Sequence, residues 1–263
     1  MTDGSREDVL RRRKIRRRLH YLTVTGTIIA VCFAVWALLW SDWFRIRTIN
    51  AQVRDDLNQG IAQDAWNFIN AQKPIAVPKT NALLLNRGML NATLVDEFPE
   101  MRNFQFVYNV PERTLFVRAT PRETAAILCE GLAQCYAMDD HAIPFKVQDA
   151  STSRRFLEIM DQSGLQVSLG TQAIPDEYFE ALIEYWNAGQ NLGVLTNAVI
   201  EKQSLDAGYI RFDTSQGWYL LVKTNLDPES TYAKVQTVLK TEIKDPAKIS
   251  YIDARYTDKV YYK

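Results

Sequence analysis

Residues 21–40, YLTVTGTIIAVCFAVWALLW, form a stretch of 20 residues without a charged side chain. At about 1.5 Å of rise per residue, a helix of this length spans roughly 30 Å, the thickness of a bilayer's hydrocarbon core. The stretch therefore predicts a transmembrane helix. The alternative is a cleaved signal peptide. Such a peptide has a shorter apolar core and small residues at its cleavage site, whereas this stretch ends in the bulky sequence ALLWSDW.

The charges around this stretch predict its orientation. Residues 1–20 contain the run RRRKIRRR and only three acidic residues, Asp3, Glu7 and Asp8. Basic flanks are retained in the cytoplasm, so we expect a cytoplasmic N-terminus and an extracytoplasmic region after residue 40. The arginine run is also compatible with nucleic-acid binding. Beside a span, however, topology and attraction to anionic lipid headgroups explain it better.

The rest of the chain is typical of a folded α+β region. The whole sequence balances 31 basic against 31 acidic residues, and removing the basic tail leaves a mild acidic excess that argues against a nucleic-acid partner. Periodicity predicts a strand over residues 44–53, helices over 55–71 and 89–98, and two alternating strands before Pro121. The resulting order, β-α-α-β-β, fits two helices packed on a small sheet.

The second half predicts a mixed α/β domain that ends in a long strand region over residues 249–262. Its strongest helix signals are Pro175 with the acids behind it, and Asp227 as an N-cap residue. The predicted organisation is a cytoplasmic tail (1–20), a transmembrane helix (21–40), a first domain (44–122) and a C-terminal domain (123–263).

Cysteine is scarce, and two of the three residues lie outside the apolar stretch. Cys129 and Cys135 are six residues apart in a region where disulfides persist if the orientation is right. On paired strands of a hairpin they would be able to bond. Spacing alone does not establish that geometry, so two separate thiols are equally compatible with the sequence.

Searches for catalytic motifs point away from an enzyme. The chain has no G-x-S-x-G, P-loop, G-x-G-x-x-G or H-E-x-x-H motif, and His141 has no evident partner. Asp139 and Asp140 are compatible with a cation site or with a solvated hairpin tip. We therefore expect no catalytic, cofactor-binding or metal-binding residues and no small-molecule substrate.

The last residues are typical of a protein-binding surface. Tyr256, Tyr261 and Tyr262 alternate with charged residues, and tyrosine and arginine dominate interface hot spots. A strand near a chain end is able to lie at a sheet edge and accept a strand from a partner. The alternative is that these tyrosines close the core of the C-terminal domain.

Three segments carry a resemblance to a known family. They are FPEMRNFQFVYNVPERTLFVRATPRETAAILC (98–129), CYAMDDHAIPF (135–145) and YIDARYTDKVYYK (251–263). Together with the basic tail and the single span, their order and spacing resemble the FtsQ/DivIB bacterial cell-division proteins. The first extracytoplasmic domain resembles a POTRA domain.

The resemblance implies a non-catalytic scaffold of the divisome, a single-pass plasma-membrane protein at the septum that links early and late division proteins. Its implied partners are membrane lipid and small coiled-coil division proteins of the FtsB/DivIC and FtsL types, with no nucleic acid. The alternatives are a membrane-anchored POTRA protein of a transport or assembly pathway and an anchored extracytoplasmic enzyme. The residues implied to contact the coiled-coil partners are Arg255, Tyr256, Lys259, Val260, Tyr261 and Tyr262.

Overall fold

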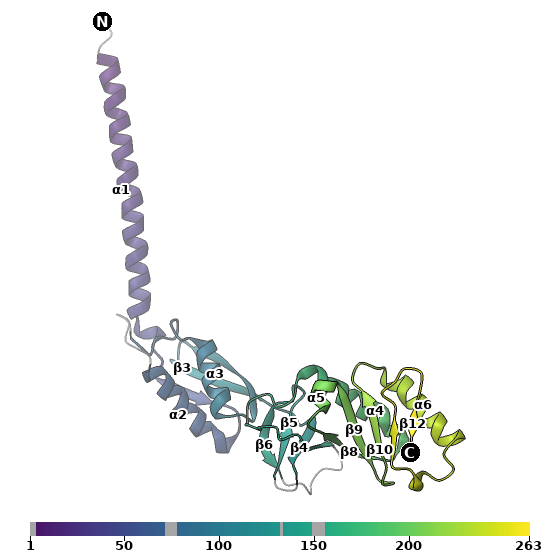
Figure 1. Ribbon diagram of the computed structural model, residues 1–263. Helices are drawn as coiled ribbons and strands as arrows, with labels where there is room; N and C mark the ends of the chain where they lie inside the picture. The colour runs from purple at the N-terminus through teal and green to yellow at the C-terminus, as the bar shows by residue number, and fades with distance from the viewer. Residues whose placement is uncertain (1–3, 72–77, 132–133, 149–155) are drawn as a thin grey trace. The chain divides into compact units, whose positions relative to one another are not determined.

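The computed structural model describes residues 4–71, 78–131, 134–148 and 156–263. It has a mixed α+β architecture with an apolar helix at its N-terminal end (Figure 1). The chain forms two compact units. The first contains Met1–Leu94 and Phe104–Ala119, and the second contains Val95–Asn103 and Thr120–Lys263.

The N-terminal helix, α1, covers Gly4–Trp40. Its segment His20–Trp40 has a mean hydropathy of 2.2 and is long and apolar enough to cross a membrane. A signal sequence also meets these two criteria, so length and composition alone do not distinguish it from a membrane anchor. The predicted strand over 44–53 is too long. Asp42–Phe44 forms a single 3-10 turn because the Ser41 hydroxyl accepts a hydrogen bond from the backbone of Trp43 (3.2 Å). The strand begins only at Thr48.

The first unit has the predicted strand and helix order. Helices α2 and α3 bury Ile61, Ala65, Ile69, Leu90 and Leu94. The sheet order is β1-β3-β2, with β1 parallel to β3. The elements are β1 (Thr48–Ala51), α2 (Asp55–Ala71), α3 (Arg87–Glu97), β2 (Met101–Asn109) and β3 (Thr114–Pro121).

A mixed sheet organises the second unit. Among the described residues it has nine strands in the order β12-β11-β10-β9-β8-β7-β4-β5-β6. Its elements are β4 (Ala126–Glu130), β5 (Gln134–Met138), β6 (Pro144–Gln148), β7 (Leu157–Asp161), α4 (Asp176–Gly189), β8 (Leu195–Ile200), α5 (Ser204–Ala207), β9 (Tyr209–Thr214), β10 (Tyr219–Lys223), α6 (Pro228–Thr241), β11 (Tyr251–Asp253) and β12 (Tyr261–Tyr262).

Helices α4 and α6 cover one face of this sheet. Their side chains join alternate strand residues in one hydrophobic core, which includes Phe179, Tyr185, Phe212, Trp218 and Tyr232. As predicted, Asp227 caps α6 by accepting a hydrogen bond from the Ser230 backbone (2.7 Å). Residues on the other face of β9 are only half-buried because they alternate with the core residues.

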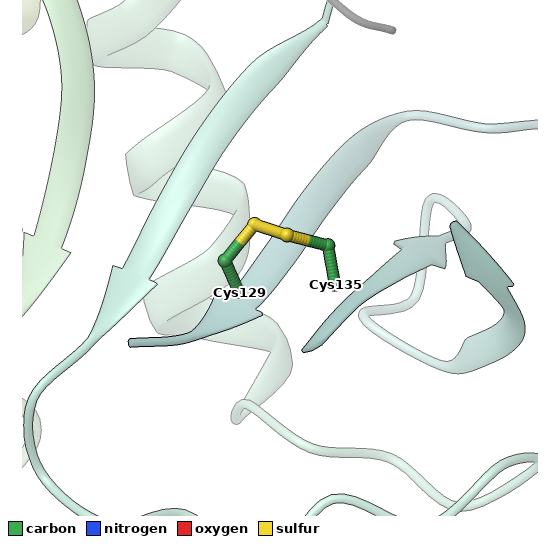
Figure 2. Close-up of a disulfide and its surroundings, with 2 residues drawn as sticks. All are labelled: Cys129 and Cys135. Atoms are coloured by element: carbon green, nitrogen blue, oxygen red, sulfur yellow. A yellow bond between two sulfur atoms is a disulfide. The ribbon is translucent and has the colours of Figure 1, made fainter. Parts of the chain in front are cut away.

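The hairpin of β4 and β5 carries a disulfide between Cys129 and Cys135 (Figure 2). These cysteines are directly opposite each other in the strand register, and their Cα atoms are 4.0 Å apart. Both are buried against Ile127, with Phe156 and Met160 packed on the cluster. The strand pairing, which spacing alone could not establish, therefore decides in favour of the bonded form.

Removing this disulfide is expected to lower the free energy of unfolding by about 2 kcal/mol, because the bond closes only a short loop in the unfolded chain. The measurement is denaturant unfolding of the Cys129→Ala/Cys135→Ala variant against the unchanged chain. Cys32→Ser is the matched control, since that cysteine is exposed on α1 and is not bonded. An unchanged midpoint in the double variant would contradict the expectation.

Candidate partner-binding edge at the C-terminus

The predicted contact residues lie at one edge of the large sheet. Strand β11 runs parallel to β10, and β12 then pairs antiparallel with β11 in the register Ile252↔Tyr262 and Asp253↔Tyr261. Figure 1 marks the C-terminus beside β12. Within the part of the chain that the structure describes, β12 is the last strand on this side of the sheet.

The predicted long strand region over 249–262 is interrupted. The carboxylate of Asp253 accepts a hydrogen bond from the backbone N–H of Arg255 (3.1 Å), a local turn that ends β11. In a continuous strand Tyr256 would lie on the same face as Ile252 and Ala254, and the interruption prevents this. Those two residues are fully buried, whereas Tyr256 lies in the connecting loop and is 50% exposed.

The structure divides the six predicted residues into two groups. Tyr256, Lys259, Tyr261 and Tyr262 are exposed, and the rings of Tyr256 and Tyr261 meet edge to face with centroids 5.4 Å apart. Arg255 and Val260 are half-buried, and Val260 packs against the core. The alternative that these tyrosines close the core of the C-terminal domain is therefore wrong, because Tyr256, Tyr261 and Tyr262 are all exposed. We call Tyr256, Tyr261 and Tyr262 the tyrosine edge.

The loop before β12 is attached to helix α6. The ammonium group of Lys234 donates to the backbone oxygens of Thr257 (2.9 Å) and Tyr256 (3.4 Å). These carbonyls would otherwise need water, because the loop has left the sheet. The contact holds Tyr256 beside Tyr261 and gives the tyrosine edge a defined shape.

The backbone of β12 offers hydrogen-bonding groups to a further strand. Lys263 donates its N–H to the carbonyl oxygen of Tyr251 (3.2 Å), so the backbone of Lys263 faces β11. In an antiparallel ladder, neighbouring residues face opposite ways. The N–H and C=O of Tyr262 therefore point away from β11, toward the side where the described residues supply no strand.

Arg255 is not a free cation. Its guanidinium makes two hydrogen bonds to the carboxylate of Asp253, at 2.8 and 2.6 Å, and lies 5.2 Å from the ring centroid of Tyr209. The hydrogen bond to Asp253 raises the pKa of Arg255 above its ordinary value. This bidentate geometry fixes the direction of the side chain.

Arg255 continues a network on the sheet face opposite the helices, a network that was not predicted from the sequence. Glu201 accepts hydrogen bonds from the Tyr209 hydroxyl (2.7 Å) and from Arg211 (2.9 Å), and Arg211 also pairs with Asp213 (2.9 Å). Burial opposes ionisation of Glu201, but these hydrogen bonds prevail and lower its pKa. Burial, together with the bond to Glu201, raises the pKa of Tyr209 to about 12. The signal available in the sequence is the alternation of polar and apolar residues over 209–213.

Asp139 and Asp140, at the tip of the hairpin formed by β5 and β6, have different environments. Asp139 is buried and pairs with the guanidinium of Arg122, while Asp140 is exposed and pairs with Arg102 at 3.3 Å. Asp139 is buried in an ion pair, so it fits neither of the two alternatives from the sequence, a cation site or a solvated hairpin tip. Among the described residues, no group of three or more His, Cys, Asp and Glu side chains has the geometry to hold a metal ion.

A cavity of about 470 Å³ lies between this tip and α4. The residues that line it include the apolar Phe179 and Ile183 and the polar Asp140, His141 and Asp176. His141 contacts Arg102 (2.7 Å) and lies 4.0 Å from Asp176. No Ser, Thr or Cys is among the described residues that line it.

Comparison with known proteins adds no identification: no family model matches the chain, and no curated protein matches it.

Proposed function

We propose that this chain is a membrane-anchored, non-catalytic scaffold of bacterial cell division. In this proposal the POTRA-like first unit and the C-terminal unit are presented outside the plasma membrane. The C-terminal unit captures a small coiled-coil division protein of the FtsB/DivIC type, and with it an FtsL-like protein. The observation that carries the proposal is the outward-facing backbone of Tyr262 within the exposed tyrosine edge.

Strand addition is the binding mode that fits this edge. An edge strand presents unpaired backbone groups that are able to continue a sheet into a partner chain. Tyrosines supply large contact areas with few rotatable bonds, which favours interface hot spots. In the tyrosine edge, the outward-facing backbone of Tyr262 would therefore supply affinity, and the three exposed rings would supply specificity.

The membrane arrangement has three supports. The helix His20–Trp40 is long enough to span a bilayer, and the bulky residues after it disfavour cleavage as a signal peptide. The basic N-terminal run favours a cytoplasmic N-terminus. The disulfide between Cys129 and Cys135 fits an oxidising compartment on the other side.

The first unit supports the POTRA-like assignment through its order and pairing. Two helices lie in sequence between β1 and β2, and the sheet order β1-β3-β2 places the last strand in the centre. Such a unit is compact enough to act as a separate recognition module. In the proposal it contributes, with the span, to bringing the protein to the septum.

A fluorescent protein fused to the cytoplasmic N-terminus tests the division role in growing bacteria. We expect a band at mid-cell in dividing cells, because a divisome scaffold is concentrated where the septum forms. The matched control is the span with its basic tail, residues 1–40, fused in the same way, which should label the membrane evenly. Even membrane labelling by the full chain would contradict the proposal and favour a transport or signalling role.

A further inference from the structure

A turn of the first unit, residues 81–84, is attached to the end of the apolar helix. Asn81 is fully buried, and its side-chain amide donates to the backbone oxygen of Leu39 at 2.7 Å. The last carbonyls of a helix have no partner within the helix, so this amide satisfies one of them. The Asn81 side-chain oxygen in turn accepts from the backbone N–H of Leu83 (2.8 Å). One side chain thus links the helix end to the turn.

Backbone contacts hold the same two segments together. Ile46 donates to Thr80 (2.8 Å), and Ala82 donates to Phe44 (2.7 Å), forming a small antiparallel bridge. The Tyr108 hydroxyl contacts the backbone oxygens just after the helix, at Trp43 and Arg45. With these hydrogen bonds in place, the turn stays next to the end of the helix.

This region exposes large apolar side chains. Trp43 is 67% exposed, Leu83 55% and Leu84 47%. We call these three residues the juxtamembrane patch. The segments that carry it, residues 41–47 and 78–87, contain four basic residues, Arg45, Arg47, Lys79 and Arg87, against the single acid Asp42. Exposed apolar residues carried by segments with a basic excess are typical of a surface that contacts the interfacial layer of a membrane.

We propose that the juxtamembrane patch lies in the headgroup layer of the bilayer, beside the point where the span emerges. The partner is the lipid surface. The inference rests on the membrane anchoring in the proposed function and is independent of the division role.

The short chain distance between Asn81 and Leu83 places the juxtamembrane patch at the depth of the headgroup layer. Leu83 is two residues from Asn81, so their Cα atoms are at most about 7 Å apart, while each interfacial layer is roughly 5–8 Å thick. Asn81 itself contacts Leu39, near the end of the hydrocarbon-spanning segment. Trp43 adds an indole, a side chain enriched at membrane interfaces. The patch would make the first unit rest on the membrane instead of pivoting freely on the span.

Spin labelling tests the proposal on the full chain in vesicles of phosphatidylethanolamine and phosphatidylglycerol. Cys32→Ser removes the exposed native thiol, and Leu83→Cys then carries a nitroxide. Val147→Cys is the matched control, because Val147 is 49% exposed on β6 in the other unit. We expect the ratio of collisions with oxygen to collisions with a water-soluble nickel chelate to be several-fold higher at 83 than at 147.

Carbonate extraction of the same vesicles separates the two possible failures. Equal collision ratios at the two positions, with the protein still retained in the membrane, would overturn the patch while leaving the anchor intact. Release of the protein by carbonate would overturn the anchor and the patch with it. Retention together with the raised ratio at position 83 supports the proposal.

Discussion

Replacing Tyr262 by proline is expected to weaken capture of the proposed coiled-coil partner about tenfold or more, while the free energy of unfolding stays unchanged. Proline removes the N–H that points away from β11 and leaves the inward hydrogen bond of Lys263 in place. A partner strand would then bury an acceptor without a donor, which costs about 1–3 kcal/mol. Since 1.4 kcal/mol corresponds to a factor of ten, the loss is measurable by pull-down and by titration.

Companion variants separate the backbone from the side chains. Tyr262→Ala removes only the ring, so it should weaken capture less than proline does. Tyr256→Ala should abolish capture because it removes the ring that packs against Tyr261, and deletion of residues 255–263 should do so because it removes the whole tyrosine edge, while the first unit stays folded. Val147→Ala, on the opposite edge strand β6, is the matched control and should have no effect. Unchanged capture by the proline and Tyr256 variants would refute strand addition at this edge.

Arg122→Ala is expected to destabilise the second unit by about 3–5 kcal/mol. Arg122 and Asp139 form an ion pair with side chains only 5% and 2% exposed, and Arg122 also donates to the backbone oxygen of Pro99 (3.0 Å). The Asp139 carboxylate accepts from the backbone of His141 and Ile143 as well, so it cannot turn toward water. Removing the arginine leaves a buried charge without its counterion.

Denaturant unfolding of the full chain in detergent measures this effect. Arg102→Ala is the matched control, because its pair with Asp140 joins side chains that are 44% and 60% exposed, and such a pair contributes at most about 1 kcal/mol. The double variant Arg122→Met/Asp139→Asn should recover part of the loss, since it removes both buried charges and the amide oxygen at position 139 is still able to accept from His141 and Ile143. Equal destabilisation by Arg122→Ala and Arg102→Ala would show that burial does not distinguish the two pairs.

Local elements were largely predictable because their signals lie within a few residues. The helix over 55–71 has its apolar residues on one side, and Asp227 supplies a cap within one turn of α6. The first strand was predicted too long because residues 44–46 pair with residues 80–82 in an isolated bridge, and only Thr48–Ala51 join the sheet. The end of β11 was missed because the Asp253 side chain competes with the strand ladder for the backbone of Arg255.

The candidate edge was predictable in location but not in detail. The tyrosines near the C-terminus mark it in the sequence. Which of them are exposed depends on β12 folding back onto β11 and on Lys234 holding the loop between them. Glu201, Tyr209 and Arg211 belong to strands or turns far along the chain from Arg255, and only the sheet brings them together.

By itself, the sequence determined the apolar helix, the basic N-terminal run and most of the helices and strands, because length, charge and periodicity are properties of short segments. Only the tertiary structure decided the disulfide, the burial of Asp139 against Arg122, the outward backbone of Tyr262 and the link from Asn81 to Leu39. These features join residues through strand register and packing. Local preferences do not specify which distant segments meet, whereas burial of a shared core and satisfaction of its polar groups do.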